Sequence, residues 1–204
     1  MMINLKELRR KLHWYGFIGA IRLIVNLICT WLLYRPARLI RLPTYIRSTK
    51  KLVFGRNFTS GIGLRIDVLD NGVIHLGSDI QMNDHVHIAV LQSVSIGDSC
   101  LIASRVFISD HNHGRFDDNC VDYGADVPPA MRPLHSKPVK IGKNVWLGEA
   151  VCILPGVAIG DGSVIGAGSI VTHSIPSFCL AVGNPAKVLR RYDPATREWK
   201  KIGG

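Results

Sequence analysis

The chain has 204 residues, of which 47% are hydrophobic and 20% are charged, and this balance excludes a disordered chain. Its formal net charge of +10 lies entirely in residues 1–51, which hold eleven basic residues and one acidic residue. The rest of the chain is neutral overall, so a surface for an anionic partner is expected in the N-terminal quarter.

Residues 3–34 show a helical pattern that ends before Pro36. Residues 17–34 are rich in Ile, Leu, Val and Trp, but Arg22 interrupts them and further arginines flank them. About 20 apolar residues are needed to cross a bilayer, and a buried arginine is costly. The pattern therefore favours a helix in the membrane interface over a spanning helix or a nucleic-acid-binding arm. A helix packed on its own domain or on a neighbouring subunit would show the same pattern.

No small-residue cleavage site follows the apolar stretch, so we do not expect it to be removed as a signal peptide. The cysteines are odd in number and lack the CxxC spacing of metal or redox sites. We expect them to be reduced, non-catalytic residues of a cytosolic protein. They are Cys29, Cys100, Cys120, Cys152 and Cys179.

Residues 35–51 contain Pro36 and Pro43 and are interpreted as a connector. From residue 52 onwards, short β-like runs alternate with Gly, Asn and Asp. An apolar residue returns at every sixth position, except at one point where the spacing is eight; we call these two extra residues the slip. The members are Leu76, Met82 and Ile88 before the slip, and Ile96, Ile102 and Ile108 after it.

The same period is strongest in residues 141–176, and it does not match the 3.6-residue turn of an α-helix. A second aliphatic or small residue falls four positions after each member. Such tracts are typical of a parallel β-helix, in which each coil buries its apolar edge against the coils on either side. The leading members are Ile141, Leu147, Ile153, Ile159, Ile165 and Val171.

Residues 110–138 interrupt the period with polar, charged, Pro and Gly residues. Loops of this length inside a compact domain are uncommon and tend to be functional. We therefore divide the chain into an N-terminal segment, 1–51, a β-helix domain, 52–190, which contains this loop, and a tail, 191–204.

Four histidines form two His-x-His pairs, His85 with His87 and His111 with His113. On a β-strand, residues i and i+2 face the same side, so each pair could present two imidazoles together. Such a pair could supply a general base for a sugar hydroxyl, or the four could form a zinc site. The first pair is equally well explained as polar strand residues, whereas the loop position favours a role for the second.

The six-residue series, the loop after Ile108 and the closing run 183–187 together resemble the hexapeptide-repeat acyltransferases. Within that superfamily, residues 9–204 are similar to bacterial O-acetyltransferases of the lipopolysaccharide O-antigen type. The runs 58–61, 83–89 and 108–114 carry the closer match. The resemblance implies an all-β, left-handed parallel β-helix, a homotrimer with active sites between subunits, acetyl-CoA as the donor, and no metal.

In related sugar acetyltransferases, a loop histidine is the base. An ungapped count from Ile102 places His113 at that position, whereas a two-residue gap would place His111 there; both remain candidates, with His113 preferred. No cysteine is needed in such a direct transfer.

Asn83 matches an asparagine that orients the acceptor in those relatives, and Asp84 and His87 lie in the same run as candidates for acceptor binding. An aspartate that binds acceptor in the relatives falls here on Leu91. This departure leaves the acceptor sugar undetermined.

The resemblance also implies a cofactor groove formed by eight positions of this chain. Backbone groups of the solenoid turns would contact the pantetheine arm, and the basic positions would pair with phosphates. The positions are Trp146, Gly148, Glu149, Ala167, Thr172, His173, Lys187 and Arg190. Glu149 and His173 replace a serine and a lysine of the relatives.

The sequence thus predicts an acetyl-CoA-dependent O-acetyltransferase that acetylates a sugar hydroxyl of a cell-surface polysaccharide precursor. The acceptor is a free, nucleotide-linked or lipid-linked saccharide, and residues 1–51 would hold a cytoplasmic enzyme against the inner face of the inner membrane. Two alternatives remain. A γ-carbonic-anhydrase-like metal enzyme would need a wider His-x4-His spacing, which is absent, and a non-catalytic solenoid scaffold would need neither loop histidines nor a groove.

Overall fold

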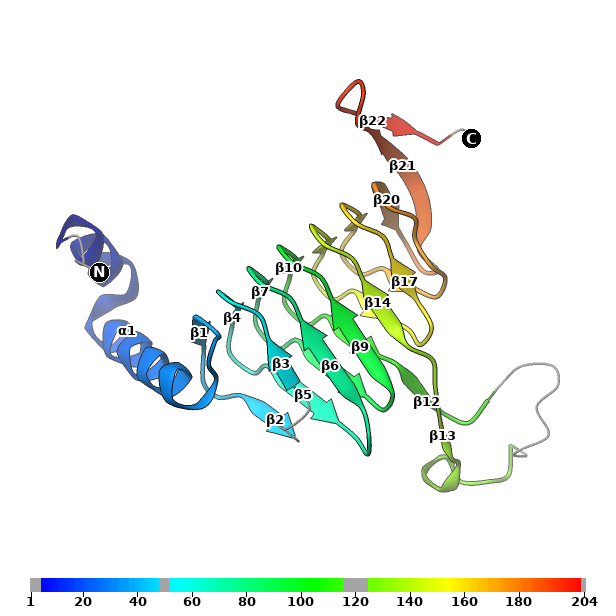
Figure 1. Ribbon diagram of the computed structural model, residues 1–204, viewed down its shortest axis with the longest axis horizontal. Helices are drawn as coiled ribbons and strands as arrows, with labels where there is room; N and C mark the ends of the chain where they lie inside the picture. Colours follow the sequence, from blue (N-terminus) through cyan, green and yellow to red (C-terminus); the bar gives the residue numbers. More distant parts are fainter. Residues whose placement is uncertain (1–4, 48–51, 116–124, 203–204) are drawn as a thin grey trace.

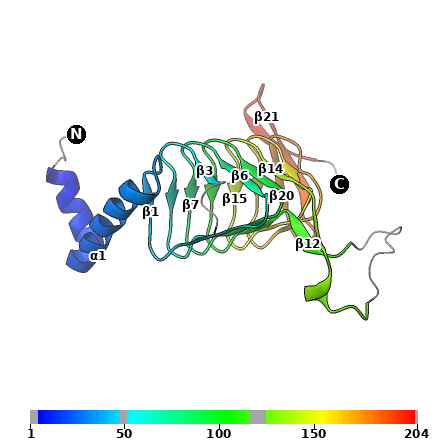
Figure 2. The same ribbon diagram turned by 60° about the horizontal axis from the view of Figure 1, so that its bottom comes forward.

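The computed structural model describes residues 5–47, 52–115 and 125–202, and its main body is a parallel β-helix (Figure 1). Short strands of successive coils stack into three sheets, called A, B and C below, one for each side of the solenoid (Figure 2). The parallel β-helix expected from the six-residue period is therefore confirmed.

Sheet A has nine strands, of which the first seven are parallel rungs and the last two form an antiparallel extension. In spatial order they are β1 (Leu39–Ile40), β4 (Thr59–Ser60), β7 (Gln81–Met82), β10 (Leu101–Ile102), β15 (Trp146–Leu147), β18 (Val164–Ile165), β20 (Cys179–Val182), β21 (Lys187–Asp193) and β22 (Glu198–Lys201).

Sheets B and C contain parallel rungs throughout. Sheet B consists of β2 (Tyr45–Arg47), β5 (Arg65–Val68), β8 (His87–Val90), β11 (Phe107–Ser109), β16 (Cys152–Ile153) and β19 (Ile170–Val171). Sheet C consists of β3 (Leu52–Phe54), β6 (Val73–Leu76), β9 (Ser93–Ile96), β14 (Val139–Ile141) and β17 (Ala158–Ile159).

The predicted period corresponds to the inward-facing column of each sheet. Every leading residue of both series is buried, and so is each residue four positions later in the second series, including Ser163 and Ser169. Register places equivalent members on top of one another, as in Ile88, Ile108 and Ile153 of sheet B. The core is thus a stack of aliphatic layers enclosed by three backbone ladders.

Two segment boundaries differ from those drawn from the sequence. The expected connector 35–51 contributes two rungs, β1 paired with β4 and β2 paired with β5. These strands have only two and three residues, too few to show a period, which is why the prolines dominated the prediction. At the other end, β21 runs across residue 190 and pairs with β22, so the solenoid's extension includes much of the expected tail.

Helix α1 (Leu5–Leu33) covers the N-terminal end of the solenoid, opposite the β21–β22 hairpin (Figure 1, Figure 2). It is kinked at Gly16, whose φ of 62° is not helical. Hydrogen bonds dock its last turns on the first coil: Thr30 Oγ1 accepts the Ile40 amide at 2.8 Å, and Asn26 Oδ1 accepts the Leu42 amide at 3.1 Å. These side chains satisfy edge amides that have no preceding rung to pair with.

Between Tyr15 and Leu33, α1 exposes apolar side chains on most of its surface. Phe17, Leu33 and Ile18 are 78%, 69% and 68% exposed. Residues Tyr15–Leu33 are long and apolar enough to cross a membrane by length and composition, so the preference for an interfacial over a spanning helix is not confirmed. An exposed apolar surface of this extent is typical of a contact with a membrane or with another protein.

We predict that substitutions at two neighbouring residues of β6, one facing the core and one facing outward, have different effects on stability. Ile74→Ala should lower the free energy of unfolding by about 2–5 kcal/mol, because Ile74 is fully buried and its loss leaves a cavity. His75→Ala, at the exposed neighbouring position, should change it by less than about 0.5 kcal/mol. Urea unfolding of both variants checks this, and equal effects would contradict the assigned register.

Candidate functional site

The outer face of sheet B carries the chemically distinctive side chains. Because alternate residues of a strand face outward, register aligns Tyr45, Arg65, His87 and Phe107 in one column of successive rungs. A parallel column beside it contains Arg47 and Asp67. The N-terminal half of this face is therefore charged. Its C-terminal half continues with Cys152 and Ile170 and is apolar.

His87 is held by a carboxylate on the neighbouring strand. Its Nε2 lies 3.2 Å from Asp67 Oδ2, and its ring packs 5.2 Å from the ring of Phe107. Burial lowers the pKa of His87; the hydrogen bond to Asp67 opposes this, and the positive charges of Arg65 and His111 add to the lowering. The ring is consequently biased towards neutrality, with Nε2–H donating to Asp67 and Nδ1 left as an acceptor.

Asp67 binds three cationic or polar partners at once. Arg65 Nε lies 2.6 Å from Oδ2, and Arg47 Nε lies 3.5 Å from Oδ1. Burial acts to raise the pKa of Asp67, but the hydrogen bonds from Arg65 and His87 and the charges of both arginines lower it on balance. Asp67 is thus a carboxylate that orients His87 and anchors two arginines.

Asp110 closes the corner between sheets B and C at the two-residue slip noted in the sequence. Its side chain is completely buried, and its carboxylate accepts the amides of Leu91, Gln92 and Ser93 at 2.8, 2.8 and 2.7 Å. The extra residues of this corner have no rung of their own to pair with, so a carboxylate supplies the missing acceptors.

The same carboxylate positions His111, the first residue of β12 (His111–His113). His111 Nδ1 lies 3.0 Å from Asp110 Oδ1, and the side chain is only 11% exposed. His113 lies on the same strand two residues later with an exposed side chain, and its ring makes no hydrogen bond to the described residues. The structure therefore places one fixed and one accessible imidazole on one strand.

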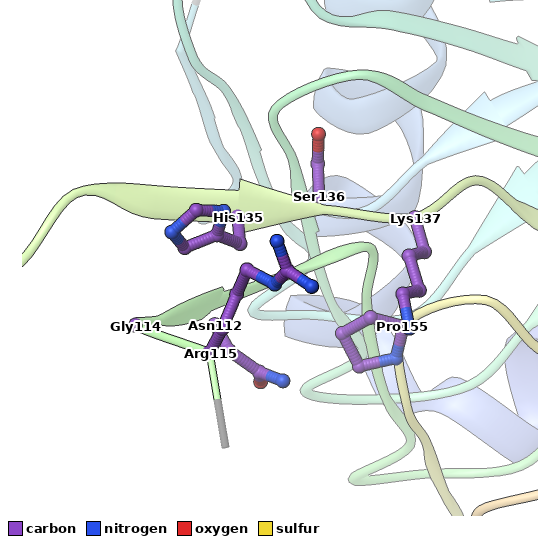
Figure 3. A pocket seen from close by; sticks show the side chains of 7 residues that line it. All are labelled: Asn112, Gly114, Arg115, His135, Ser136, Lys137 and Pro155. Atoms are coloured by element: carbon purple, nitrogen blue, oxygen red, sulfur yellow. The ribbon is translucent and has the colours of Figure 1, made fainter. Parts of the chain in front are cut away.

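Strand β12 pairs with β13 (Leu134–Ser136) in a hairpin that projects from the solenoid, and a 3₁₀ turn at Pro129–Met131 lies between the two strands, just before β13 (Figure 2). A pocket opens between this hairpin and the next coil, and Figure 3 shows its lining side chains. Those side chains are mostly polar, and His135 Nε2 is buried there without a hydrogen-bond partner in the described structure. The lining residues are Asn112, Gly114, Arg115, His135, Ser136, Lys137 and Pro155.

The first His-x-His pair is not a strand pair. His85 occupies a turn with φ 58°, and only His87 belongs to a strand, so the two do not present their rings side by side as strand neighbours would. Among the residues that the structure describes, no group of three His, Cys, Asp or Glu side chains is placed to hold a metal ion. The four-histidine zinc arrangement considered from the sequence is therefore not formed by these residues.

The corner between sheets A and B brings several predicted residues into one line. The Asn83 amide donates to Ile102 O, the Ala103 amide to Leu147 O, and the Gly148 amide to Ile165 O, which stacks these turns coil upon coil. Asn83 and Asp84 are exposed there, and Asp84 Oδ1 accepts the Ile62 amide at 2.9 Å.

Further along this corner lie four of the expected cofactor residues. Trp146 is 51% exposed on sheet A, and a Cβ on Gly148 would approach the Ala167 amide to 2.6 Å, so only glycine fits. Glu149 is engaged with the preceding coil, accepting the Ser104 amide at 3.1 Å and contacting Arg105 Nη1 at 3.4 Å. This carboxylate therefore shapes the corner and does not extend freely from it.

The other expected cofactor residues lie elsewhere on the single chain. Thr172 and His173 follow β19 at the corner between sheets B and C, where Thr172 Oγ1 lies 2.8 Å from His173 Nδ1. Lys187 and Arg190 lie on β21 at the C-terminal end, and Arg190 Nη1 donates to Trp199 O at 3.3 Å. One chain therefore does not assemble all eight positions into a single groove.

Sequence reasoning missed four residues that organise this face. Arg65 and Asp67 belong to none of the motifs found in the sequence, and their importance follows only from the register that stacks them beside His87. Asp110 is the first residue of the loop in the sequence analysis, but its role there was not recognised. The two-residue slip in the six-residue period was the available signal, because it marks a corner whose extra amides need hydrogen-bond acceptors. His135 pairs opposite Asn112, a relation set by the hairpin.

Residues 138–173 match the family model described as the hexapeptide repeat of succinyl-transferase. A protein of Escherichia coli strain K12, named for lipopolysaccharide biosynthesis O-acetyl transferase activity and called WbbJ, is 49% identical over 187 residues, which make up 92% of this chain and 95% of that protein.

Solved structures show the same solenoid. Galactoside acetyltransferase in complex with coenzyme A is 30% identical with a TM-score of 0.51, and the match covers 79% of this chain and 68% of that one. AntD, an N-acyltransferase from Bacillus cereus, has a TM-score of 0.66 at 20% identity over 79% of this chain and 83% of that one. At that identity the second likeness concerns the fold alone.

We predict that Asp110 stabilises the B–C corner. Asp110→Ala should lower the free energy of unfolding by about 2–4 kcal/mol, because three amides and a histidine lose their acceptor together. Asp126→Ala, at an exposed carboxylate of the same loop, should change it by less than about 0.5 kcal/mol. Urea unfolding measures both; an Asp110 variant as stable as the Asp126 variant would be inconsistent with this role.

Proposed function

Because the chain belongs to the hexapeptide-repeat acyltransferases, we propose that it transfers the acetyl group of acetyl-CoA to a sugar hydroxyl of a cell-surface polysaccharide precursor. The observation that carries this proposal is the identity along nearly the whole chain with the E. coli lipopolysaccharide O-acetyl transferase. The coenzyme A complex of galactoside acetyltransferase supports the choice of donor.

In the proposed mechanism, His113 takes the proton of the acceptor hydroxyl, and the oxygen attacks the thioester carbonyl of acetyl-CoA. The tetrahedral intermediate collapses by breaking the carbon–sulfur bond, and the proton passes from His113 to the departing sulfur. Donors near the carbonyl oxygen stabilise the negative charge that develops on it. No acyl-enzyme forms, so no cysteine is required.

The exposure of the two side chains supports His113, and not His111, as the general base. The His113 side chain is exposed, whereas the His111 ring is largely covered and donates Nδ1–H to Asp110. His111 is therefore assigned as a positioning residue that fixes β12, although its Nε2 makes it the alternative base. His87 presents a neutral Nδ1 to the same face and is assigned, with Asn83 and Asp84, to acceptor binding.

A trimer would complete the cofactor site. The expected cofactor residues lie at the A–B corner, at the B–C corner and on β21 of one chain, so a groove between neighbouring subunits would unite positions that one chain separates. The exposed apolar surface of α1 supports contact with the membrane at the cytoplasmic face, where lipid-linked precursors would be presented.

His113→Ala should lower kcat by about 10²- to 10⁴-fold while leaving acetyl-CoA affinity nearly unchanged, because a general base contributes on that scale. His111→Ala should cost about tenfold or less if it positions the strand. The measurement is transfer of label from acetyl-CoA to a panel of free, nucleotide-linked and lipid-linked saccharides.

His75→Ala, an exposed histidine on sheet C, is the matched control and should retain full activity. A larger loss in the His111 variant would reverse the two assignments. Retention of activity in both would move the base to His87. Failure of the wild-type protein to acetylate any saccharide would refute the proposed function.

Ile24→Glu combined with Ile28→Glu should reduce binding to anionic vesicles at least tenfold in flotation assays, because both side chains are more than half exposed on α1. Neither side chain belongs to the docked face that contains Asn26 and Thr30, so binding of coenzyme A should persist. If these residues instead form a subunit contact, light scattering would show a smaller oligomer and flotation would be unchanged.

A further inference from the structure

The charged half of sheet B contains a cavity that the catalytic proposal does not use. It lies at the N-terminal end of the solenoid, and its walls, which combine apolar and charged side chains, come from adjacent rungs. The lining residues are Pro43, Tyr45, Ile46, Arg47, Gly63, Arg65, Asp67 and His85.

The cavity has more positive than negative charge. Arg47 and Arg65 both approach Asp67 through Nε, so one carboxylate faces two guanidinium groups. Their side chains are 66% and 52% exposed, which leaves the remaining N–H groups available to a ligand. A pair of guanidinium groups with one excess charge is suited to a phosphate or diphosphate, which accepts such forked donors.

The cavity is linked directly to His87, which is assigned to acceptor binding. Asp67 Oδ2 contacts both Arg65 and His87, and Arg65 lies one rung from His87 in the same outward column. Adjacent strands are about 4.8 Å apart, so a phosphoryl group on Arg65 would be separated from His87 by roughly the width of one sugar ring.

The cavity also adjoins the membrane-directed helix. Asn26 of α1 accepts the amide of Leu42, and the next residue, Pro43, lines the cavity. A lipid carrier held near α1 would therefore bring its phosphates to Arg47 and Arg65 before the attached sugar reached the histidines.

We propose that Arg47 and Arg65 bind the diphosphate of a glycosyl diphosphate, so that the sugar acetylated is the one attached to that diphosphate or its immediate neighbour. This proposal rests on the proposed acetyl transfer and specifies its acceptor. A neutral, free oligosaccharide would leave this charged cavity unfilled and would be the poorer acceptor.

The test uses the full-length protein in detergent micelles with saturating coenzyme A, which occupies the cofactor's own phosphate site. Inorganic pyrophosphate, titrated by calorimetry, should bind the wild-type protein. Arg47→Gln and Arg65→Gln should each weaken it about tenfold or more. Arg56→Gln removes an exposed arginine from a different corner of the same end and should leave binding within about twofold.

Two further arms identify the source of the diphosphate. A polyprenyl diphosphate in the micelles should bind more tightly than uridine diphosphate if the acceptor is lipid-linked, and no more tightly if it is nucleotide-linked. Arg47→Gln should weaken whichever compound is preferred.

Absence of pyrophosphate binding to the protein loaded with coenzyme A, or wild-type affinity in both the Arg47 and Arg65 variants, would overturn this inference alone. Absence of coenzyme A binding would instead contradict the proposed function. Arg65→Lys retains the charge without the forked donor and should show an intermediate loss, which separates ligand binding from misfolding of the Asp67 cluster.

Discussion

The structure depends on the requirement that backbone amides of one coil find acceptors on a neighbouring coil. Equivalent residues must stack, as Ile88, Ile108 and Ile153 do, and this forces coils to match in length. The six-residue aliphatic period and the backbone ladders therefore both result from the stacking of equivalent residues in successive coils. Residues that exceed the regular coil cannot stay within a ladder and must leave at a corner.

The functional features follow from how those excess residues are accommodated. The corner after β8 contains two extra residues, and Asp110 supplies the acceptors that the missing rung would have provided. The same carboxylate holds His111, so Asp110 both satisfies the amides of the corner and fixes the first residue of the β12–β13 hairpin. Because the interior is filled by aliphatic layers, side chains with chemical functions are confined to the outer face and the corners.

The ends of the solenoid present a second problem, since a terminal coil has an unpaired ladder edge. Helix α1 covers one end through Thr30 and Asn26, and the β21–β22 hairpin continues sheet A at the other. The docked side of α1 has polar side chains that match amides, whereas most of the other side chains between Tyr15 and Leu33 are apolar and exposed. One helix therefore closes the solenoid and also presents an apolar surface outward.

The sequence by itself determined the fold class and the position of the excursion, because a six-residue period reports burial directly and its interruption is visible without any structure. It also determined the candidate histidines of the loop. It did not determine the pairing of His87 with Asp67 and Arg65, since these residues come from different coils and meet only through register. It mistook 35–51 for a connector, because rungs of two or three residues are too short to carry a period. Only the tertiary structure showed that His111 is held by Asp110 while His113 is exposed, since strand spacing makes the two equivalent and burial distinguishes them.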